Sequence, residues 1–256
     1  MWFAILGPVE VRDGDGNLRV SSARQRTLLA ALLARPGHAV SAATLTEAVW
    51  NGFPPVTATE TLRSHVMGLR RALGPQGGQR VLARYPGYLI DVGERELDAT
   101  VFAAGVRRAT EEERSERWTN CVRELTAALA LWRGMPLSDV PESALVDETV
   151  LALRELHLQA QRMRFHAQLQ LGQHREIISE LMTLVRRNPS REEFTAQLML
   201  ALYRDDRQAE ALAAFMRTRS FLSDEYGIDP GARLQQLYCQ ILRKEVRAEP
   251  VTRDRR

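Results

Sequence analysis

The sequence contains little cysteine. Its 256 residues include only Cys121 and Cys239, each inside an apolar pattern of helical spacing. A disulfide framework requires more cysteines, so we interpret both as buried free thiols. This scarcity gives no support to redox chemistry.

Long hydrophobic runs are also missing. A helix that spans a bilayer needs about 20 consecutive apolar residues, and no segment of this chain approaches that length. The N-terminus, MWFAILGPVEV, lacks the charged start and the small-residue cleavage site of a signal peptide. We therefore expect a cytoplasmic protein with no membrane partner. Its 45% of apolar residues is enough to build the cores of two domains.

Catalytic and metal-binding patterns are absent as well. The single lysine, Lys244, does not follow a glycine-rich phosphate loop, and the five histidines show no metal-ligand spacing with acids or cysteines. The sequence has no nucleophile elbow. We predict that the protein is not an enzyme and that it uses no cofactor and no metal ion.

Positive charge is concentrated in the first part of the chain. Residues 1–97 hold 11 Arg and 8 acidic residues, whereas the remainder holds 24 basic and 24 acidic residues, so the net charge of +3 lies in the first part. Between residues 19 and 88, nine Arg accompany only Glu47 and Glu60. Such a segment is typical of a surface that contacts phosphates.

The N-terminal segment predicts strands followed by two helices. The first 20 residues alternate and turn like short antiparallel strands, with a turn at residues 14–17. RQRTLLAALLARPG (residues 24–37) then predicts a helix that ends at Pro36-Gly37. A second, short helix is predicted after Ser41, which can cap it. One face of the first helix carries Leu28, Leu29, Leu32 and Leu33.

A basic amphipathic helix and a basic hairpin come next. TLRSHVMGLRRAL (residues 61–73) predicts a helix that starts near Ala58, where Thr57 and Glu60 have the spacing of a capping box. RVLARYPGYLIDV (residues 80–92) predicts a hairpin. The helix has an apolar stripe made of Leu62, Val66, Leu69 and Leu73. This order of elements is typical of a winged-helix DNA-binding domain.

The side of this helix opposite the apolar stripe is the predicted DNA-contacting face, with the helix lying in the major groove. Arg63 is the first candidate for reading a base, because a guanidinium can bind guanine at two atoms. Met67 suits a thymine methyl group, and Arg70 suits a phosphate, although one of the two terminal arginines has a structural role as its alternative. The predicted contacts of this helix are Thr61, Arg63, Ser64, His65, Met67, Arg70 and Arg71.

Further contacts are predicted outside this helix. Arg24 and Arg26 begin the first helix, where they can hold a phosphate, with ordinary solvated side chains as the alternative. The predicted hairpin of residues 80–92 would form the wing of this domain, and Arg80 and Arg84 are expected to face the minor groove from it. We interpret the two tyrosines of the wing, Tyr85 and Tyr88, as packing residues, and the Tyr88 hydroxyl is also a candidate phosphate contact.

The C-terminal part predicts stacked helical hairpins. The segments that begin at Gly172 and Asp206 recur after 34 residues at matching points of two hairpins, which is the period of tetratricopeptide repeats. Asp206 stands where such a repeat prefers glycine. Stacked hairpins leave a groove, so this part is expected to contact proteins.

The order of these segments resembles a known family. GPVEVRD, RQRTLLAALLARPGHAVS, LTEAVW, TLRSHVMGLRRAL and PGYLIDV together resemble the OmpR-type winged helix of the Streptomyces antibiotic regulatory protein family. ALALWRGMPLSDV and AQLMLALYRDDRQAEALAAF resemble the bacterial transcriptional activator domain that follows it in this family. We therefore expect an α+β winged-helix DNA-binding domain over residues 1–95. An all-α tetratricopeptide-like domain is expected over residues 96–247 and a basic, disordered tail over residues 248–256.

The resemblance implies a sequence-specific transcriptional activator at the nucleoid. Such a protein binds tandem direct repeats in promoter DNA as at least a dimer and recruits RNA polymerase through its sigma factor. Family members commonly regulate an antibiotic or secondary-metabolite gene cluster. Two alternatives stay open, namely a repressor with the same DNA-binding domain and a tetratricopeptide-type adaptor that binds nucleic acid without specificity.

Gly68 departs from the family pattern, which commonly has Arg at this position. The departure implies either a different target sequence or a close approach of a neighbouring element to the helix.

Overall fold

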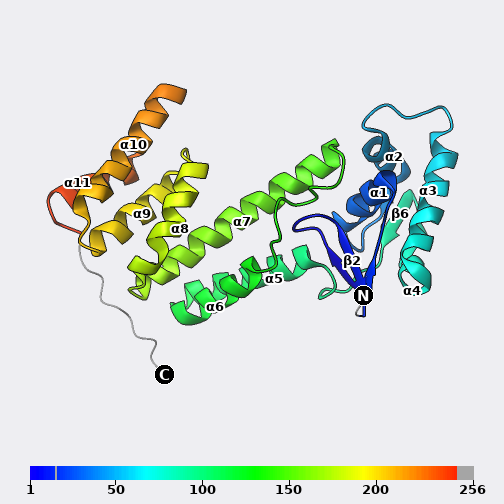
Figure 1. Cartoon of the computed structure of the whole chain (residues 1–256), viewed down its shortest axis with the longest axis horizontal. Coiled ribbons are helices and arrows are strands. Elements are labelled where there is room, and N and C mark those ends of the chain that lie inside the picture. The colour runs from blue at the N-terminus through cyan, green and yellow to red at the C-terminus, as the bar shows by residue number, and fades with distance from the viewer. Residues whose placement is uncertain (15, 247–256) are drawn as a thin grey trace. The chain divides into compact units, whose positions relative to one another are not determined.

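The computed structural model describes residues 1–14 and 16–246 (Figure 1). The tail that we predicted over residues 248–256 lies outside these described residues. The chain packs as two compact units, which are described separately. Of the described residues, unit 1 comprises 1–107 and 127–158, without residue 15, and unit 2 comprises 108–126 and 159–246.

The packing does not follow the sequence-based division after residue 95. The buried carboxylate of Asp98 accepts hydrogen bonds from the backbone amides of Ile5 (2.8 Å) and Leu6 (2.9 Å). These bonds join the N-terminal segment to the start of α5, so unit 1 extends beyond the predicted division. Three helices contribute residues to both units: α5 (Asp98–Arg114), α6 (Trp118–Leu129) and α7 (Ala144–Gln170).

Unit 1 begins with a small antiparallel sheet, as predicted. The predicted turn over residues 14–17 was too long, because Gly16 and Asn17 already pair with Asp13 and Arg12 in the third strand. Phe3 pairs with Val11, and Val11 pairs with Leu18 on the next strand. Phe3 and Val11 are buried, so one face of this sheet joins the core of unit 1. The strands, in spatial order, are β1 (Trp2–Ala4), β2 (Glu10–Asp13) and β3 (Gly16–Leu18).

Three helices form the centre of unit 1: α1 (Ala23–Leu33), α2 (Ala42–Trp50) and α3 (Ala58–Ala72). α1 packs against both α2 and α3, and its four predicted core leucines are buried. The cap of α2 is formed as predicted, because Ser41 Oγ accepts a hydrogen bond from the Thr44 amide at 3.0 Å.

α3 begins at Ala58 and buries its apolar stripe, as predicted. The predicted capping box was wrong, because the Thr57 side chain makes no capping hydrogen bond. The Thr57 backbone has φ −91° and ψ 20°, whereas a capping residue is usually extended and thereby directs its oxygen at the first-turn amides. Instead, Thr61 Oγ1 donates a hydrogen bond to the Thr57 carbonyl at 2.9 Å.

The wing is a hairpin of β5 (Val81–Arg84) and β6 (Gly87–Ile90), and β4 (Val40–Ser41) pairs with β6. A Cβ atom on Gly87 would lie 2.1 Å from the Val40 carbonyl oxygen, so this pairing requires glycine. The short helix α4 (Gly74–Gln79) lies between α3 and the wing, and the sequence did not predict it because its three glycines give no helical pattern.

Unit 2 is built from helices joined by one repeated turn. Glu116, Gly172 and Asp206 occupy the centres of three such turns with φ of 54°, 76° and 59°. In each turn the next residue's amide bonds a carbonyl five positions earlier, as Arg207 does with Leu202 at 2.9 Å. The predicted hairpins and their matching points are thereby confirmed. Besides parts of α5, α6 and α7, unit 2 contains α8 (His174–Arg187), α9 (Glu192–Arg204), α10 (Gln208–Tyr226) and α11 (Ala232–Leu242).

The helices of unit 2 pack as neighbours. α9 packs against α8, α10 and α11, which corresponds to their arrangement in Figure 1. Within residues 1–14 and 16–246, none of the helices has the length and apolar character that crossing a membrane requires.

The two cysteines are free thiols in different environments. Cys121 is buried, and burial raises the pKa of its thiol to about 12. Cys239 is exposed, so the prediction of a second buried thiol was wrong. α11 buries Leu234 and Ile241, and Cys239 lies on a different side of this helix.

The turn at Asp206 provides a test of backbone strain. A positive φ costs a non-glycine residue on the order of 1 kcal/mol, so we expect Asp206→Gly to stabilise the protein by up to about that amount. Asp206→Ala should destabilise it, because alanine has no side-chain oxygen to support this conformation locally. Urea denaturation of the three proteins measures the difference, and equal midpoints for all three would contradict the strain.

Candidate nucleic-acid interface

The outer face of α3 presents exposed polar and cationic side chains, and the Ser64 hydroxyl among them donates a hydrogen bond to the Glu60 carbonyl at 3.3 Å. Arg63, Ser64, Met67 and Arg71 are exposed, and 58% of Met67 is accessible to solvent. Neither Arg63 nor Arg71 has an ion-pair or hydrogen-bond partner within the described part of the chain. The burial of the opposite stripe fixes the orientation of these side chains, so together they form a surface that can meet an anion.

Arg70 differs from its neighbours on α3. Its Nε and Nη2 atoms donate hydrogen bonds to the Val81 carbonyl at 3.0 and 2.7 Å. The guanidinium therefore attaches the first strand of the wing to α3. We revise the expected phosphate contact of Arg70 to the structural role that the sequence had left open.

Arg26 also makes structural contacts. Its Nη1 donates hydrogen bonds to the carbonyls of Val20 (3.0 Å) and Ser21 (2.8 Å), and its Nε lies 3.2 Å from a carboxylate oxygen of Asp139. These contacts occupy the guanidinium, so we no longer expect Arg26 to hold a phosphate.

The N-terminus of α1 remains open to an anion. Arg24 is exposed, with its guanidinium carbon 5.8 Å from the centre of the Trp50 ring. Ser22 precedes the helix without capping it through its side chain. Amide groups of a first helical turn that lack a capping side chain can bind a phosphate oxygen. Arg24 and this helix end therefore form a candidate phosphate site.

His65 packs beside the same tryptophan. Its ring centre lies 5.8 Å from that of Trp50, and its Nε2 is buried without a hydrogen-bond partner in the described structure. Burial, assisted by the nearby Arg24 charge, lowers the pKa of His65. The neutral ring is therefore a packing residue rather than a cationic phosphate ligand.

The two predicted DNA-contacting arginines of the wing differ, because one is already paired inside the protein and the other is not. Arg80 pairs with Glu96 through both guanidinium nitrogens, with Nη2 2.9 Å from Oε1, and this hydrogen bonding lowers the pKa of Glu96 to about 2. Arg80 is thus bound at the base of the wing, and we revise its expected minor-groove contact. Arg84 is exposed without a partner among the described residues.

The two tyrosines of the wing have different environments. Tyr88 packs against the core of unit 1, which confirms its interpretation as a packing residue. Tyr85 is 97% exposed, so the packing interpretation of this residue was wrong. It lies in the hairpin turn, beyond the last paired residues, where no other strand covers it. Together, Arg84 and Tyr85 form an exposed tip of the wing.

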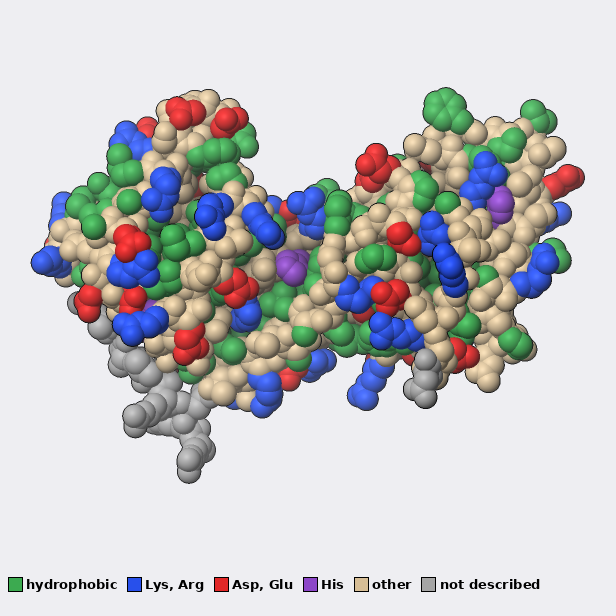
Figure 2. Space-filling model, in the orientation of Figure 1, with side chains coloured by type: hydrophobic (Ala, Val, Ile, Leu, Met, Phe, Trp, Pro, Cys, Tyr) green, Lys and Arg blue, Asp and Glu red, His purple; other side chains and the backbone are tan. Residues whose placement is uncertain are grey.

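Another exposed surface of unit 1 is apolar. The loop between α2 and α3, residues 51–57, carries Phe53 at 87% exposure and Val56 at 107%. Figure 2 shows hydrophobic side chains that protrude from this loop at the upper right. Exposed apolar side chains on a loop are candidates for contact with another protein.

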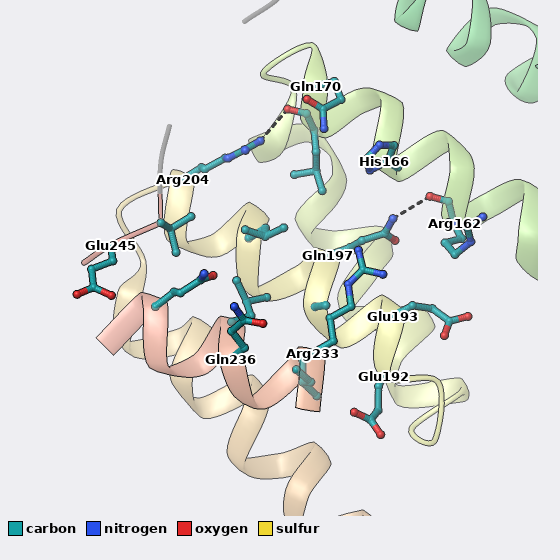
Figure 3. Close-up of a pocket in the computed structure, with 17 residues that line it drawn as sticks. Arg162, His166, Gln170, Glu192, Glu193, Gln197, Arg204, Arg233, Gln236 and Glu245 are labelled. Atoms are coloured by element: carbon teal, nitrogen blue, oxygen red, sulfur yellow. Dashed lines mark hydrogen bonds between the residues drawn. The ribbon is translucent and has the colours of Figure 1, made fainter. Parts of the chain in front are cut away.

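Unit 2 contains a groove of about 990 Å³ between α7, α9 and α11 (Figure 3). Its lining includes Leu169, Leu200 and Leu237 together with polar side chains. Gln197 donates a hydrogen bond to the Arg162 carbonyl at 2.8 Å. This mixture of apolar and polar groups suits a peptide or another amphipathic ligand.

A winged helix with an exposed cationic helix face, joined to an all-helical domain, defines a DNA-binding transcriptional regulator. The family model for the C-terminal domain of transcriptional regulatory proteins matches residues 18–90, and that for the bacterial transcriptional activator domain matches residues 97–242. The chain belongs to the Streptomyces antibiotic regulatory protein family of transcriptional activators.

Individual relatives agree with this membership. The regulatory protein DnrI of Streptomyces peucetius is 32% identical, and the match covers 96% of this chain and 93% of DnrI. The regulatory protein AfsR of Streptomyces griseus is 37% identical over 95% of this chain, which spans only 24% of AfsR. The solved structure of Mycobacterium tuberculosis EmbR, in complex with a low-affinity phosphopeptide, matches with a TM-score of 0.90 and 31% identity. That match covers 95% of this chain and 65% of the EmbR chain.

The environment of His65 predicts a pH dependence. Because its pKa is lowered in the folded protein, the unfolded chain binds a proton that the folded chain resists. Stability attributable to His65 should therefore fall as the pH drops below its ordinary pKa of 6.5. We expect His65→Gln to lose less stability than the wild type between about pH 7.5 and 5.5, measured by urea denaturation. Equal losses for both proteins would refute the effect.

Proposed function

We propose that this protein is a sequence-specific transcriptional activator that binds tandem direct repeats in promoter DNA as a dimer. It recruits RNA polymerase through the sigma factor and regulates an antibiotic or other secondary-metabolite gene cluster. Residues 1–95 supply the DNA-binding domain, and residues 96–247 supply the activator domain. The observation that carries the proposal is the outer face of α3, where Arg63 and Arg71 are exposed and unpaired within the described chain.

The proposed DNA surface has three parts. The outer face of α3 enters the major groove, where Arg63 reads a guanine and Met67 contacts a thymine methyl group. Arg24 and the N-terminus of α1 hold a phosphate, because that helix end has no capping side chain. Arg84 and Tyr85 extend from the wing toward the adjacent minor groove. In this arrangement Arg26, Arg70 and Arg80 do not contact DNA, and their hydrogen bonds inside unit 1 hold α1 and the wing in position.

Variants can distinguish Arg63, which is proposed to contact a base, from Arg71, which is proposed to contact a phosphate. We expect Arg63→Ala to reduce discrimination at one G·C base pair by about 1–3 kcal/mol. Arg71→Ala should instead weaken binding to all sequences and reduce the salt slope of log K by about 1. Selection of bound genomic fragments, followed by titrations at several salt concentrations, gives both quantities.

The outcomes of this experiment differ clearly. Enrichment of a direct repeat by the wild type supports the proposed function and identifies the regulated genes. Recovery of fragments without a common sequence would favour a non-specific nucleic-acid-binding adaptor. A repressor would enrich specific sites but lower transcription from the promoters that contain them.

The activation step is assigned to the loop over residues 51–57. Its exposed Phe53 and Val56 side chains offer an apolar surface to RNA polymerase. This apolar surface is not part of the three-part DNA surface. Transcription then requires this loop, while DNA binding does not.

We expect the double variant Phe53→Ala, Val56→Ala to retain DNA affinity and to lose at least about tenfold in activated transcription, since exposed aromatic anchors dominate protein contacts. Transcription with purified RNA polymerase measures the loss. Leu151→Ala is the matched control, because this leucine of unit 1 is also exposed, at 62%. Full activation by the double variant would exclude this loop as the contact surface.

A further inference from the structure

The helix α3 lacks a side chain at one position next to its outer face, because this position is Gly68. Gly68 lies on α3 between His65 and Arg71, toward α1. The side chain of Gln25, from the first turns of α1, fills the space in front of it. A Cβ atom on Gly68 would lie 2.3 Å from Gln25 Nε2 and 3.2 Å from Gln25 Cδ. Glycine at position 68 is therefore what allows the Gln25 amide to lie directly against α3.

The Gln25 carboxamide is not used inside the protein. The side chain is half-buried, and no hydrogen bond joins it to another residue in the described structure. Neither polar atom of this amide is fully buried, so both its oxygen and its nitrogen are accessible at the surface. The side chain can therefore donate to and accept from a bound partner without breaking a bond inside the protein.

The neighbouring groups identify the kind of partner. Arg24 precedes Gln25 and is exposed at the candidate phosphate site, while Ser64 and Arg71 flank Gly68 on the outer face of α3. The amide thus lies between the candidate phosphate site at Arg24 and the outer face of α3. Gln25 is neutral, so it gains little from a phosphate, whereas a carboxamide matches the N6 donor and N7 acceptor of adenine.

We propose that Gln25 is a specificity-determining residue that reads an adenine in the major groove. It acts in place of the side chain that Gly68 lacks, so α1 contributes a base contact to a surface otherwise formed by α3. This proposal rests on the proposed function, because it requires the outer face of α3 to enter the major groove.

The test compares base preference in selected DNA for the wild type and two variants. Gln25→Ala removes the amide, and Gly68→Ala adds a methyl group that displaces it without removing it. Both variants should reduce the preference for the same A·T base pair by about five- to hundredfold, while affinity for unrelated DNA and the salt slope stay unchanged. Gln159→Ala is the matched control, because it removes an exposed glutamine from unit 2 and should leave every preference unchanged.

Several results would overturn the proposal. Unchanged base preference in Gln25→Ala would show that the amide only packs against α3. Equal weakening on all sequences together with a smaller salt slope would make it part of the phosphate site. If the wild type selected no sequence at all, the proposed function would fail first. A wild type that selects a repeat which Gln25→Ala reads equally well would overturn only the role of Gln25.

Discussion

The burial of one stripe of α3 is the constraint on which the rest of the proposed DNA-binding surface depends. Leu62, Val66, Leu69 and Leu73 are each no more than 1% exposed, and burial of such a side chain contributes about 1.5–3 kcal/mol. The four side chains together thus contribute about 6–12 kcal/mol, whereas the two hydrogen bonds that Arg70 donates to the Val81 carbonyl contribute about 3–6 kcal/mol in total, at about 1.5–3 kcal/mol for each bond. Hydrophobic packing therefore sets the orientation of the helix, and the polar bonds then set the position of the wing relative to it.

The same constraint explains which parts of the structure the sequence predicts well. The helical period of the leucines in α1 and α3 predicts their burial, because a helix must turn its apolar side toward the core. The repeated turns at Gly172 and Asp206 were also predictable from their spacing. α4 was not predictable, because its residues have low helical propensity and tertiary packing of Gly77 and Gly78 holds it in place. The exposure of Tyr85 depends on where the hairpin ends, which an alternating pattern does not specify.

The candidate site was less predictable than the fold. An arginine in a basic segment has the same sequence signal whether it faces a phosphate or a backbone carbonyl. Arg26 lies within reach of the Val20 and Ser21 carbonyls, and Arg80 lies beside Glu96, and neither neighbour follows from a helical or strand period. Gln25 had no signal of its own, since its contact with Gly68 appears only when α1 and α3 are placed together. Spacing within an element was informative, whereas contacts between elements needed the structure.

These arginines also show why local positive charge overstates the number of phosphate contacts. Nine Arg occur between residues 19 and 88, yet Arg26, Arg70 and Arg80 are hydrogen-bonded inside unit 1. A guanidinium that bonds two carbonyls or a carboxylate is desolvated and oriented, so moving it to a phosphate would break those bonds and leave their acceptors unpaired. The exposed arginines have no such cost. They lie on a rigidly packed helix, at a helix start and at a hairpin tip, so the proposed DNA surface draws its cations from three separate elements. The internal arginines hold two of those elements in place.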